Sequence, residues 1–442
     1  MSRNQGITHA PSVLFVTTVA ITLEAFLLPF ARALRAQGSR VDALAADALT
    51  TPGISEEFDQ RFEIGWSRSV RCLLHYPRLA RDLRALVKRE GYETVWVHTP
   101  IAALVTRAAL RKVKIDPATL NGRRAGSPRP THKSGLTADS RGTSRANALE
   151  PRENEPSGHS GAPKIVYTAH GFHFYRGGHP APQQWFYRFI ERLALRWTDV
   201  LVVMNDEDEA AAQRWFSRPQ PRKRCQLVRI DGIGVDSAAW APLTLSDARI
   251  RELREHFGIP MGSFVITMIA EMNANKRHKL LIEAVAQLQH QHALPWMRLL
   301  LIGQGPLESE LREMVAARGL DEMVSFTGQL SPDELRELLA LTNVGMLVSE
   351  REGLPRSLME MCASGVLLAG TQTRGIIDEV ADERALTSEP TVAALAALIE
   401  KLAKSPTLRA ELTRKQHEHL QKRYTLDRIL PQYLELLTSP DK

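Results

Sequence analysis

Short apolar strands alternate with amphipathic helices along most of this chain, and this alternation restricts the possible folds more than any other feature. The predicted strands are Val13–Val19, Val41–Ala45, Thr94–His98, Lys164–Ala169 and Asp199–Met204 in the first half, and Phe264–Ala270, Met297–Ile302, Val324–Thr327 and Val344–Val348 in the second. Strands separated by helices pair in parallel and are covered on both faces. The rhythm breaks between 233 and 245, where Gly234 and Pro242 interrupt it. We therefore expect an α/β protein of two doubly wound domains enclosing a cleft, and 442 residues suffice for two cores.

The composition favours some partners over others. The formal net charge is +7, which suits an anionic nucleotide, a diphosphate lipid or an acidic membrane surface. Nucleic acid is not expected, because no nucleic-acid-binding motif accompanies the charge. The three cysteines have no metal or redox spacing, which favours a reducing, cytosolic compartment. The apolar segment 12–31 contains Glu24 and Pro29, so we expect a strand, a loop and a helix there and no transmembrane anchor.

The segment Lys112–Pro163 does not follow the strand–helix rhythm. It is rich in Gly, Pro, Ser, Thr and Arg and has almost no aromatic or periodic apolar residues. Such a segment cannot bury enough surface to offset its ordering entropy. We expect a flexible basic insertion, either without a function or in contact with a membrane or partner.

Two glutamates eight positions apart point to the chemistry of the second half. Glu352 lies in a Gly-Pro loop after the strand 344–348, and Glu360 lies in the helix that follows. Residues 353–355 thus stand at a helix N-terminus, where free N–H groups and the helix dipole favour an anion such as a diphosphate. The carboxylates could then accept hydrogen bonds from sugar or ribose hydroxyls. Taken alone, the pair could equally be a solvated loop acid and a salt-bridged helix glutamate.

The surroundings of this pair carry a family resemblance. Strands ending in glycines precede and follow it, at 300–306 and 370–375. With them the C-terminal half resembles glycosyltransferase family 4, whose signature is an acid pair with this spacing. The stretch 167–174, which contains His-Gly-Phe-His-Phe, is similar to that of family 4 enzymes from capsule and exopolysaccharide clusters.

The resemblance covers the chain except Lys112–Pro163, and it implies the GT-B fold of two Rossmann-like domains. Residues 1–238 would form an acceptor-binding domain, with 112–163 as its insertion, and residues 239–424 a donor domain. The last helix, 425–442, would cross back to the N-terminal domain. The implied reaction moves a sugar from a nucleotide-sugar, expected to be a UDP-sugar, to a hydroxyl with retention at the anomeric carbon.

The resemblance also implies partners and a location. The acceptor would be a glycan linked to polyprenyl diphosphate, and the enzyme would associate peripherally with the inner face of the cytoplasmic membrane. No cofactor and no essential metal are expected. The acids in 206–208 resemble a metal-binding pair, but they follow a strand at a helix start, where Asn205 can cap and acids suit the dipole.

For the donor, the resemblance assigns roles residue by residue. Glu352 would hold hydroxyls of the donor sugar, and Glu360 those of the ribose. Lys276 would stabilise the leaving diphosphate. Relatives often carry an arginine five positions before that lysine, where this chain has Glu271, and Arg277 is a possible substitute. The remaining donor-site candidates are Gly303, Gly353, Leu354 and Pro355.

On the other side of the reaction, His170 is the main catalytic candidate, because it follows a strand and would face the donor sugar. A lone histidine at such a place can also be structural. His173 would serve packing or the acceptor, and Arg68 and His98 match residues that border the acceptor. Thr22 and Leu27 stand where relatives carry histidines near the first loop, which leaves acceptor recognition open.

Two other functions fit the same residues. The chain could be a different GT-B enzyme, such as a nucleotide-sugar epimerase or a phosphorylase. It could also be a catalytically silent partner that binds a nucleotide-sugar within a polysaccharide complex, which the Glu271 replacement and the altered first loop would allow.

Overall fold

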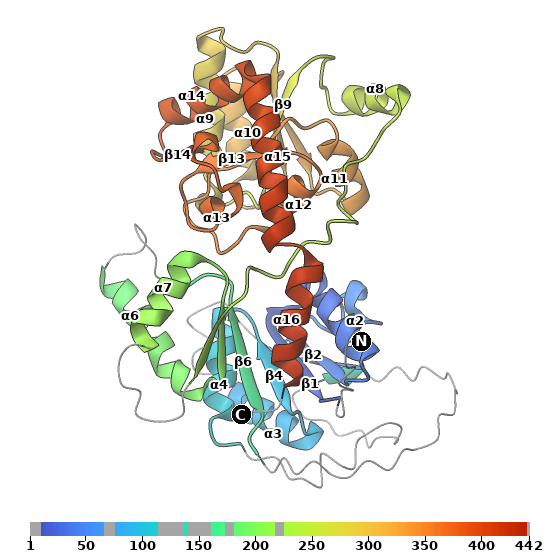
Figure 1. Cartoon of the computed structure of the whole chain (residues 1–442), viewed down its shortest axis with the longest axis vertical. Coiled ribbons are helices and arrows are strands. Elements are labelled where there is room, and N and C mark those ends of the chain that lie inside the picture. Colours follow the sequence, from blue (N-terminus) through green and yellow to red (C-terminus); the bar gives the residue numbers. More distant parts are fainter. Residues whose placement is uncertain are drawn as a thin grey trace, which may run out of the picture. The chain divides into compact units, whose positions relative to one another are not determined.

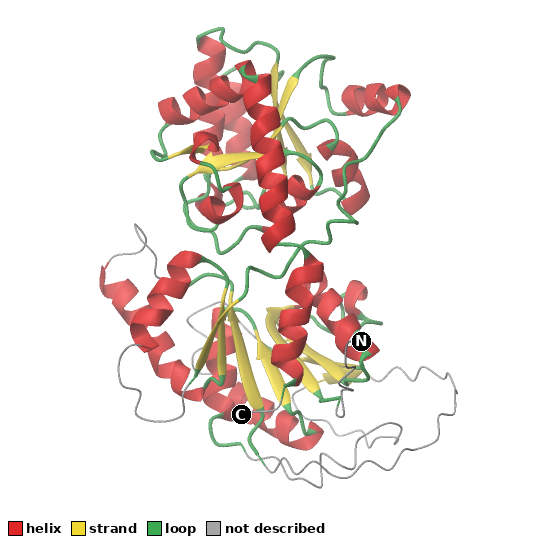
Figure 2. Ribbon diagram, in the orientation of Figure 1, coloured by secondary structure: helices red, strands yellow, loops and turns green. Residues whose placement is uncertain are grey.

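The computed structural model of the chain describes residues 10–65, 76–113, 137–139, 161–172, 181–216 and 225–439. These residues form two compact units. The N-terminal unit comprises the described residues within Met1–Val203, Asp208–Ile230 and Leu430–Lys442, and the C-terminal unit comprises Met204–Glu207 and Asp231–Ile429. Figure 2 shows that each unit is a sheet flanked by helices.

The N-terminal unit is built on an eight-stranded sheet with the order β5-β3-β2-β1-β4-β6-β7-β8. Its strands are β1 Val13–Val19, β2 Val41–Ala46, β3 Gln60–Glu63, β4 Thr94–Val97, β5 Thr137–Asp139, β6 Lys164–Ala169, β7 Val200–Val203 and β8 Gln226–Arg229. Every pair is parallel except β3 with β5. In parallel strands the carboxyl ends share one sheet edge, which brings the residues after β4 and β6 together.

Helices cover this sheet, as Figure 1 shows. In chain order they are α1 Ala20–Thr22, a π-helix at Leu23–Leu27, α2 Leu28–Ala36, a 3₁₀ turn at Pro52–Ile54, α3 Tyr76–Glu90, α4 Pro100–Leu110, α6 Ala181–Ala194, a 3₁₀ turn at Leu195–Trp197, α7 Asp206–Phe216 and α16 Leu426–Thr438. α16 belongs to the N-terminal unit from Leu430 onward. No described helix is long and apolar enough to cross a membrane.

Trp96 of β4 stands at the centre of the N-terminal core. Its ring centroid lies 4.9 Å from that of Phe15, 5.4 Å from that of Phe30 and 5.1 Å from that of Tyr433 on α16. Its indole Nε1 donates to Thr168 Oγ1 at 2.9 Å. A buried tryptophan therefore keeps its one donor satisfied while its ring packs on aromatic residues from three other elements.

The last turns of α16 are tied to the sheet by polar contacts as well. Thr94 Oγ1 donates to the carbonyl of Leu437 at 3.0 Å. Lys164 Nζ donates to the carbonyls of Leu436 and Ser439 at 2.9 and 3.0 Å. These side chains satisfy carbonyl groups that have no partner inside the helix, and the lysine charge suits the negative end of its dipole.

The C-terminal unit has a six-stranded parallel sheet with the order β11-β10-β9-β12-β13-β14. Its strands are β9 Phe264–Ile269, β10 Met297–Ile302, β11 Val324–Gly328, β12 Val344–Leu347, β13 Leu367–Thr371 and β14 Leu386–Thr387. The helices are α8 Asp247–His256, a 3₁₀ turn at Ala274–Lys276, α9 His278–His290, α10 Glu308–Ala317, α11 Pro332–Leu339, α12 Arg356–Ala363, α13 Ile376–Val380, a 3₁₀ turn at Glu383–Ala385, α14 Val392–Lys404 and α15 Pro406–Arg423.

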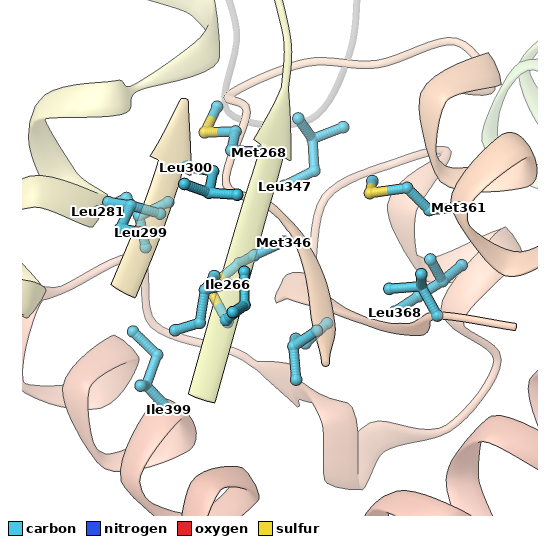
Figure 3. Packing of buried hydrophobic residues seen from close by; sticks show 14 of the residues in the cluster. Ile266, Met268, Leu281, Leu299, Leu300, Met346, Leu347, Met361, Leu368 and Ile399 are labelled. Carbon is cyan, nitrogen blue, oxygen red and sulfur yellow. The ribbon is translucent and has the colours of Figure 1, made fainter. Parts of the chain in front are cut away.

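Aliphatic side chains from both faces of this sheet form one buried cluster. Figure 3 shows Ile266 of β9 and Met346 of β12 within it, near Leu299 of β10. The packing of β12 against α12 is tight at Gly345, because a Cβ there would stand 2.4 Å from Met361 Sδ and would displace that side chain. This close approach fixes α12, and with it the loop that precedes the helix.

The α/β class and the two-sheet architecture are confirmed, and each predicted strand is present to within two residues at either end. Strand β3 and the edge strand β8 were missed because their sequences, Gln-Arg-Phe-Glu and Gln-Leu-Val-Arg, alternate too little to identify them. Most of the predicted insertion Lys112–Pro163 lies outside the described residues. Within it, Thr137–Asp139 pairs with β3, so this short piece is a strand and not part of an unstructured loop.

Candidate active site

Two loops of the C-terminal unit bring Lys276 and Glu352 together. Lys276 ends the 3₁₀ turn after β9, and Glu352 lies between β12 and α12. Lys276 Nζ donates to Glu352 Oε1 at 2.6 Å, and both side chains are largely buried. The sequence predicted a donor role for each residue, but it did not predict their contact across 76 positions.

Backbone hydrogen bonds hold these two loops side by side. The N–H of Glu350 donates to the carbonyl of Asn275 at 2.7 Å, and Asn275 Nδ2 donates to the carbonyl of Arg351 at 3.0 Å. The Asn273 side chain accepts from the N–H of Lys276 at 3.3 Å and begins the turn. The lysine–glutamate pair is therefore set by rigid main chain on both sides.

Arg277 is placed less favourably for a donor role. Its backbone has a φ of 54°, in the left-handed region, where it begins α9. Among the described residues, the ion-pair partner of its guanidinium is Glu350, at 3.9 Å, and both side chains are about one-third exposed or more. An exposed ion pair at this distance contributes little. Glu271, which stands where relatives carry an arginine, accepts a hydrogen bond from Asn273 Nδ2 at 3.0 Å.

Glu360 lies one turn inside α12, where Arg356 Nε donates to its Oε1 at 2.7 Å. Burial raises the pKa of the Glu360 carboxyl, while the Arg356 charge and hydrogen bond oppose that rise. The prediction that both glutamates flank the start of α12 is met by the geometry. The loop residues Gly353 and Leu354 precede Pro355, which occupies the N-cap position with no side-chain cap.

Arg374 is a site residue that the sequence reasoning missed. It follows β13, is 7% exposed, and its Nε donates to the carbonyl of Glu352 at 2.8 Å. The next residue, Gly375, has no room for a side chain, because a Cβ there would stand 2.6 Å from the carbonyl oxygen of Gly353. The glycine-ended stretch at 370–375 thus braces the loop that carries Glu352. Its glycines were the available signal.

Gly303 was predicted to bind the donor, and the structure gives it a packing role. With a φ of 126°, it lies so close to β9 that a Cβ would stand 2.3 Å from the carbonyl oxygen of Ala270. Only glycine fits such a position. Whether Gly303 also approaches a ligand stays a prediction.

Two buried ionisable groups lie next to the pair, and neither was predicted. Glu379 on α13 is 3% exposed, and neither carboxyl oxygen has a hydrogen-bond partner among the described residues. Burial and the nearby Glu352 charge raise its pKa well above the usual range, which favours the neutral carboxyl. His278, the first residue of α9, has its pKa lowered to about 4 by burial and by the Lys276 charge.

In the N-terminal unit, His98 and His170 face each other at the shared carboxyl edge of β4 and β6. His98 Nδ1 lies 2.8 Å from His170 Nε2. His98 is fully buried against Trp96, with ring centroids 4.4 Å apart, whereas His170 is half-buried near Phe26. Burial lowers the pKa of His170 to about 4, and burial together with the His170 charge lowers the pKa of His98 well below its usual range. Both rings are therefore neutral at pH 7.

The contact determines where each ring carries its proton. His98 Nε2 is buried and has no partner among the described residues, and a buried N–H without a partner is rarer than a buried bare lone pair. We therefore assign the His98 proton to Nδ1, from which it donates to His170 Nε2. His170 must then carry its own proton on Nδ1. The ring presents a neutral N–H donor on the side away from His98.

The backbone beside this pair is strained. Thr99 has φ 62° and ψ 134°, a conformation that β-branched residues rarely adopt. It is held by Thr18, whose N–H donates to Thr99 Oγ1 at 3.1 Å and whose hydroxyl lies 2.6 Å from it. Strain of this kind concentrates at functional sites. No sequence pattern predicted the strained conformation of Thr99.

The acids at 206–208 have a further role beyond the predicted helix start. Asp208 is buried, and its Oδ2 accepts from the N–H of Phe172 at 3.2 Å. It thereby holds the loop that follows His170. No group of three metal-ligating side chains occurs in the part of the chain that is described. The predicted residues Arg68 and His173 lie outside the described residues.

Known proteins resemble this chain in sequence and in fold. Residues 249–419 match the family model described as "Glycosyl transferases group 1". The glycosyltransferase EpsD of Bacillus subtilis (strain 168) is 28% identical over 401 residues, covering 90% of this chain and 88% of EpsD. The colanic acid biosynthesis glycosyltransferase WcaL of Escherichia coli (strain K12) is 27% identical over 172 residues, covering 37% of this chain and 38% of WcaL.

Among solved structures, Anabaena HepE in complex with UDP and glucose is 16% identical and has a TM-score of 0.67, covering 97% of this chain and 99% of that one. Identity at this level shows a common fold. The match over 249–419 supplies the family, and it contains Lys276, Glu352 and Glu360. Residues 249–419 therefore form a group 1 glycosyltransferase domain, and the chain as a whole has the GT-B fold.

Proposed function

We propose that the chain is a retaining enzyme that transfers a sugar from a UDP-sugar to a hydroxyl of a polyprenyl-diphosphate-linked glycan in exopolysaccharide or capsule biosynthesis. The observation that carries the proposal is the contact between Lys276 Nζ and Glu352 Oε1 at 2.6 Å, beside the start of α12 and one turn from Glu360. This cluster offers positive charge, an anion-binding helix end and two carboxylates within one rigid loop system.

Each group suits one part of a nucleotide-sugar. Lys276 would stabilise the negative charge that builds on the departing diphosphate, and the start of α12 would add its dipole. Glu352 would accept hydrogen bonds from sugar hydroxyls, and Glu360 from the ribose. Arg374, which holds the Glu352 carbonyl, would keep this acid in place. The fixed cations provide the charge for which other transferases use a metal, so we propose that no metal is required.

His170 would act on the other face of the reaction. Its pKa of about 4 makes it a weak base, and the proton on Nδ1 makes it a hydrogen-bond donor. A neutral imidazole N–H can donate a hydrogen bond to an oxygen of the transferred sugar. Because the imidazole is uncharged, it does not oppose the positive charge that develops at the anomeric carbon. We therefore assign His170 to orientation of the sugar and not to proton abstraction.

The relatives support the substrate classes. WcaL is named for colanic acid biosynthesis, and HepE was crystallised with UDP and glucose. We extend these classes to this chain, together with peripheral association at the inner face of the cytoplasmic membrane, where a polyprenyl-linked acceptor would be available.

The test is UDP release from a panel of UDP-sugars, measured with and without a membrane lipid extract. Wild type would be compared with Glu352→Gln and with the matched control Glu350→Gln, whose carboxylate is 44% exposed two positions upstream. We expect release that depends on one sugar, rises with lipid, is lost in Glu352→Gln and survives in Glu350→Gln. Release of an altered UDP-sugar without an acceptor would instead show an epimerase. UDP binding without release from any sugar would show a silent binding protein.

A further inference from the structure

Helix α6 exposes three large aromatic side chains to solvent. Trp185 is 66% exposed, Phe186 51% and Phe189 53%. In the described part of the N-terminal unit, the one other large hydrophobic side chain with such exposure is Ile21. Three neighbouring aromatic residues on one helix form a contiguous apolar patch, and patches of this kind mark binding surfaces.

The spacing places the three rings on one stripe of the helix. Positions 185 and 189 are one turn apart, and their rings stack with centroids 5.6 Å apart and planes inclined by 12°. Phe186 lies beside them on the same side. The rings are therefore already arranged as a flat apolar surface without any partner present. Figure 1 shows α6 on the outer flank of the N-terminal unit, where α7 also lies.

The charges of α6 are segregated. Its one acidic residue, Glu191, points inward, where its carboxylate accepts from Nη2 of the fully buried Arg107 at 3.1 Å. Basic residues occupy the exposed surface. Arg188 and Arg192 follow Trp185 and Phe189 by three positions each, and an exposed Arg196 continues the series in the next turn. The outward face of this segment thus combines aromatic rings with arginines and carries no acid.

We propose that the α6 face, made of Trp185, Phe186, Phe189, Arg192 and Arg196, docks on an anionic phospholipid bilayer. Indole and phenyl rings insert at the level of the lipid head groups, and arginines with long apolar stems reach the phosphates. A protein partner or a second copy would have to supply acids opposite the arginines. A bilayer of acidic lipids presents negative charge across its whole surface. The described α6 face has no carboxylate that this negative charge would repel.

This inference extends the proposed function by naming the surface that would bring the enzyme to a lipid-linked acceptor. It uses no residue of the donor site. Vesicle binding needs no sugar nucleotide, so the docking surface and the transferase activity can fail separately.

The experiment is co-sedimentation of the full chain with vesicles of phosphatidylglycerol and phosphatidylcholine in equal parts, and with vesicles of phosphatidylcholine alone. The aromatic variant replaces Trp185, Phe186 and Phe189 by serine, and the charge variant carries Arg192→Gln and Arg196→Gln. A control variant carries Met261→Ser and Trp296→Ser, two exposed apolar residues of the C-terminal unit. UDP binding and circular dichroism are recorded for each protein.

We expect wild type and control to bind the mixed vesicles. The aromatic variant should bind them at least about tenfold more weakly, because binding scales with buried apolar area. Each arginine replaced should weaken binding about fivefold, and UDP binding should stay unchanged in all proteins. Absence of wild-type binding, or equal binding by wild type and aromatic variant, would overturn the proposal. So would a dimer, seen by sedimentation velocity, that the aromatic variant abolishes while vesicle binding is unaffected.

Discussion

The contact between His98 and His170 predicts that His98 donates its proton from Nδ1, and two amide variants at position 98 can test this. Asparagine at position 98 places its amide nitrogen near the site of imidazole Nδ1, whereas glutamine places its amide nitrogen near the site of Nε2. If His98 donates from Nδ1 to His170 Nε2, His98→Asn retains that donor and His98→Gln loses it. The His170 proton is then no longer confined to Nδ1 in the glutamine variant.

The pKa of His170 sets the magnitude. At pH 5.5 an imidazole with the ordinary pKa of about 6.5 is about nine-tenths protonated, whereas His170, with a pKa of about 4, is almost wholly neutral. Removing the His98 ring as well, in His98→Ala, would admit water and raise the His170 pKa toward its ordinary value. The neutral fraction at pH 5.5 would then fall about tenfold, and the transfer rate would fall with it.

The assay is the initial rate of sugar transfer from pH 4.5 to 8, normalised to UDP affinity at each pH. Wild type and His98→Asn should show an acid limb near pH 4 and rates within about threefold of each other, because both retain the hydrogen bond to His170 Nε2, which contributes only modestly. His98→Ala should show the limb at about pH 6.5. Nitrogen-15 shifts of His170 would report the proton on Nδ1 directly. A wild-type limb at pH 6.5, or a proton on Nε2, would refute the assignment.

Three further outcomes follow from the C-terminal unit. Lys276→Met should lower kcat by about a hundredfold or more with a smaller change in UDP affinity, because the lysine acts on charge that develops in the transition state; equal losses in both would contradict this. Glu360→Ala should weaken the binding of UDP but not the binding of sugar phosphates, which have no nucleoside ribose. An unchanged affinity for UDP would contradict the ribose assignment. Buried, neutral His278 takes up its proton only near pH 4, while the unfolded chain takes it up near 6.5, so stability falls as pH drops between these values, by about 1.4 kcal/mol per unit. His278→Leu should flatten that dependence in thermal unfolding.

The fold could be predicted because its strands are apolar and each is followed by a helix. Lys164–Ala169 and Met297–Ile302 were bounded correctly from residue type alone. Gln60–Glu63 escaped because two of its buried residues, Gln60 and Arg61, are polar, and the edge strand Gln226–Arg229 escaped because it is only partly buried. Periodicity indicates burial, so an element that is only partly buried leaves little trace in the sequence.

The candidate site could be predicted as a set of residues but not as a set of contacts. Glu352, Lys276 and His170 were identified from position and resemblance, yet the lysine–glutamate bond joins loops 76 residues apart. The partner of His170 was known only as a separate candidate until parallel pairing of β4 and β6 put the two histidines on one edge. Arg374 and Glu379 carry no motif, and their importance comes from burial, which depends on the whole unit.

The packing of α16 has a consequence for the order in which the protein matures. Tyr433 closes the core around Trp96, and the sheet residues Thr94 and Lys164 bond to carbonyls at the end of that helix. These contacts join the first domain to residues synthesised after the whole second domain. On the ribosome, the N-terminal sheet can therefore assemble early but keeps an open flank until α16 has been synthesised. Loss of the last turn of α16 would weaken a domain whose sheet begins more than 400 residues earlier, at Val13.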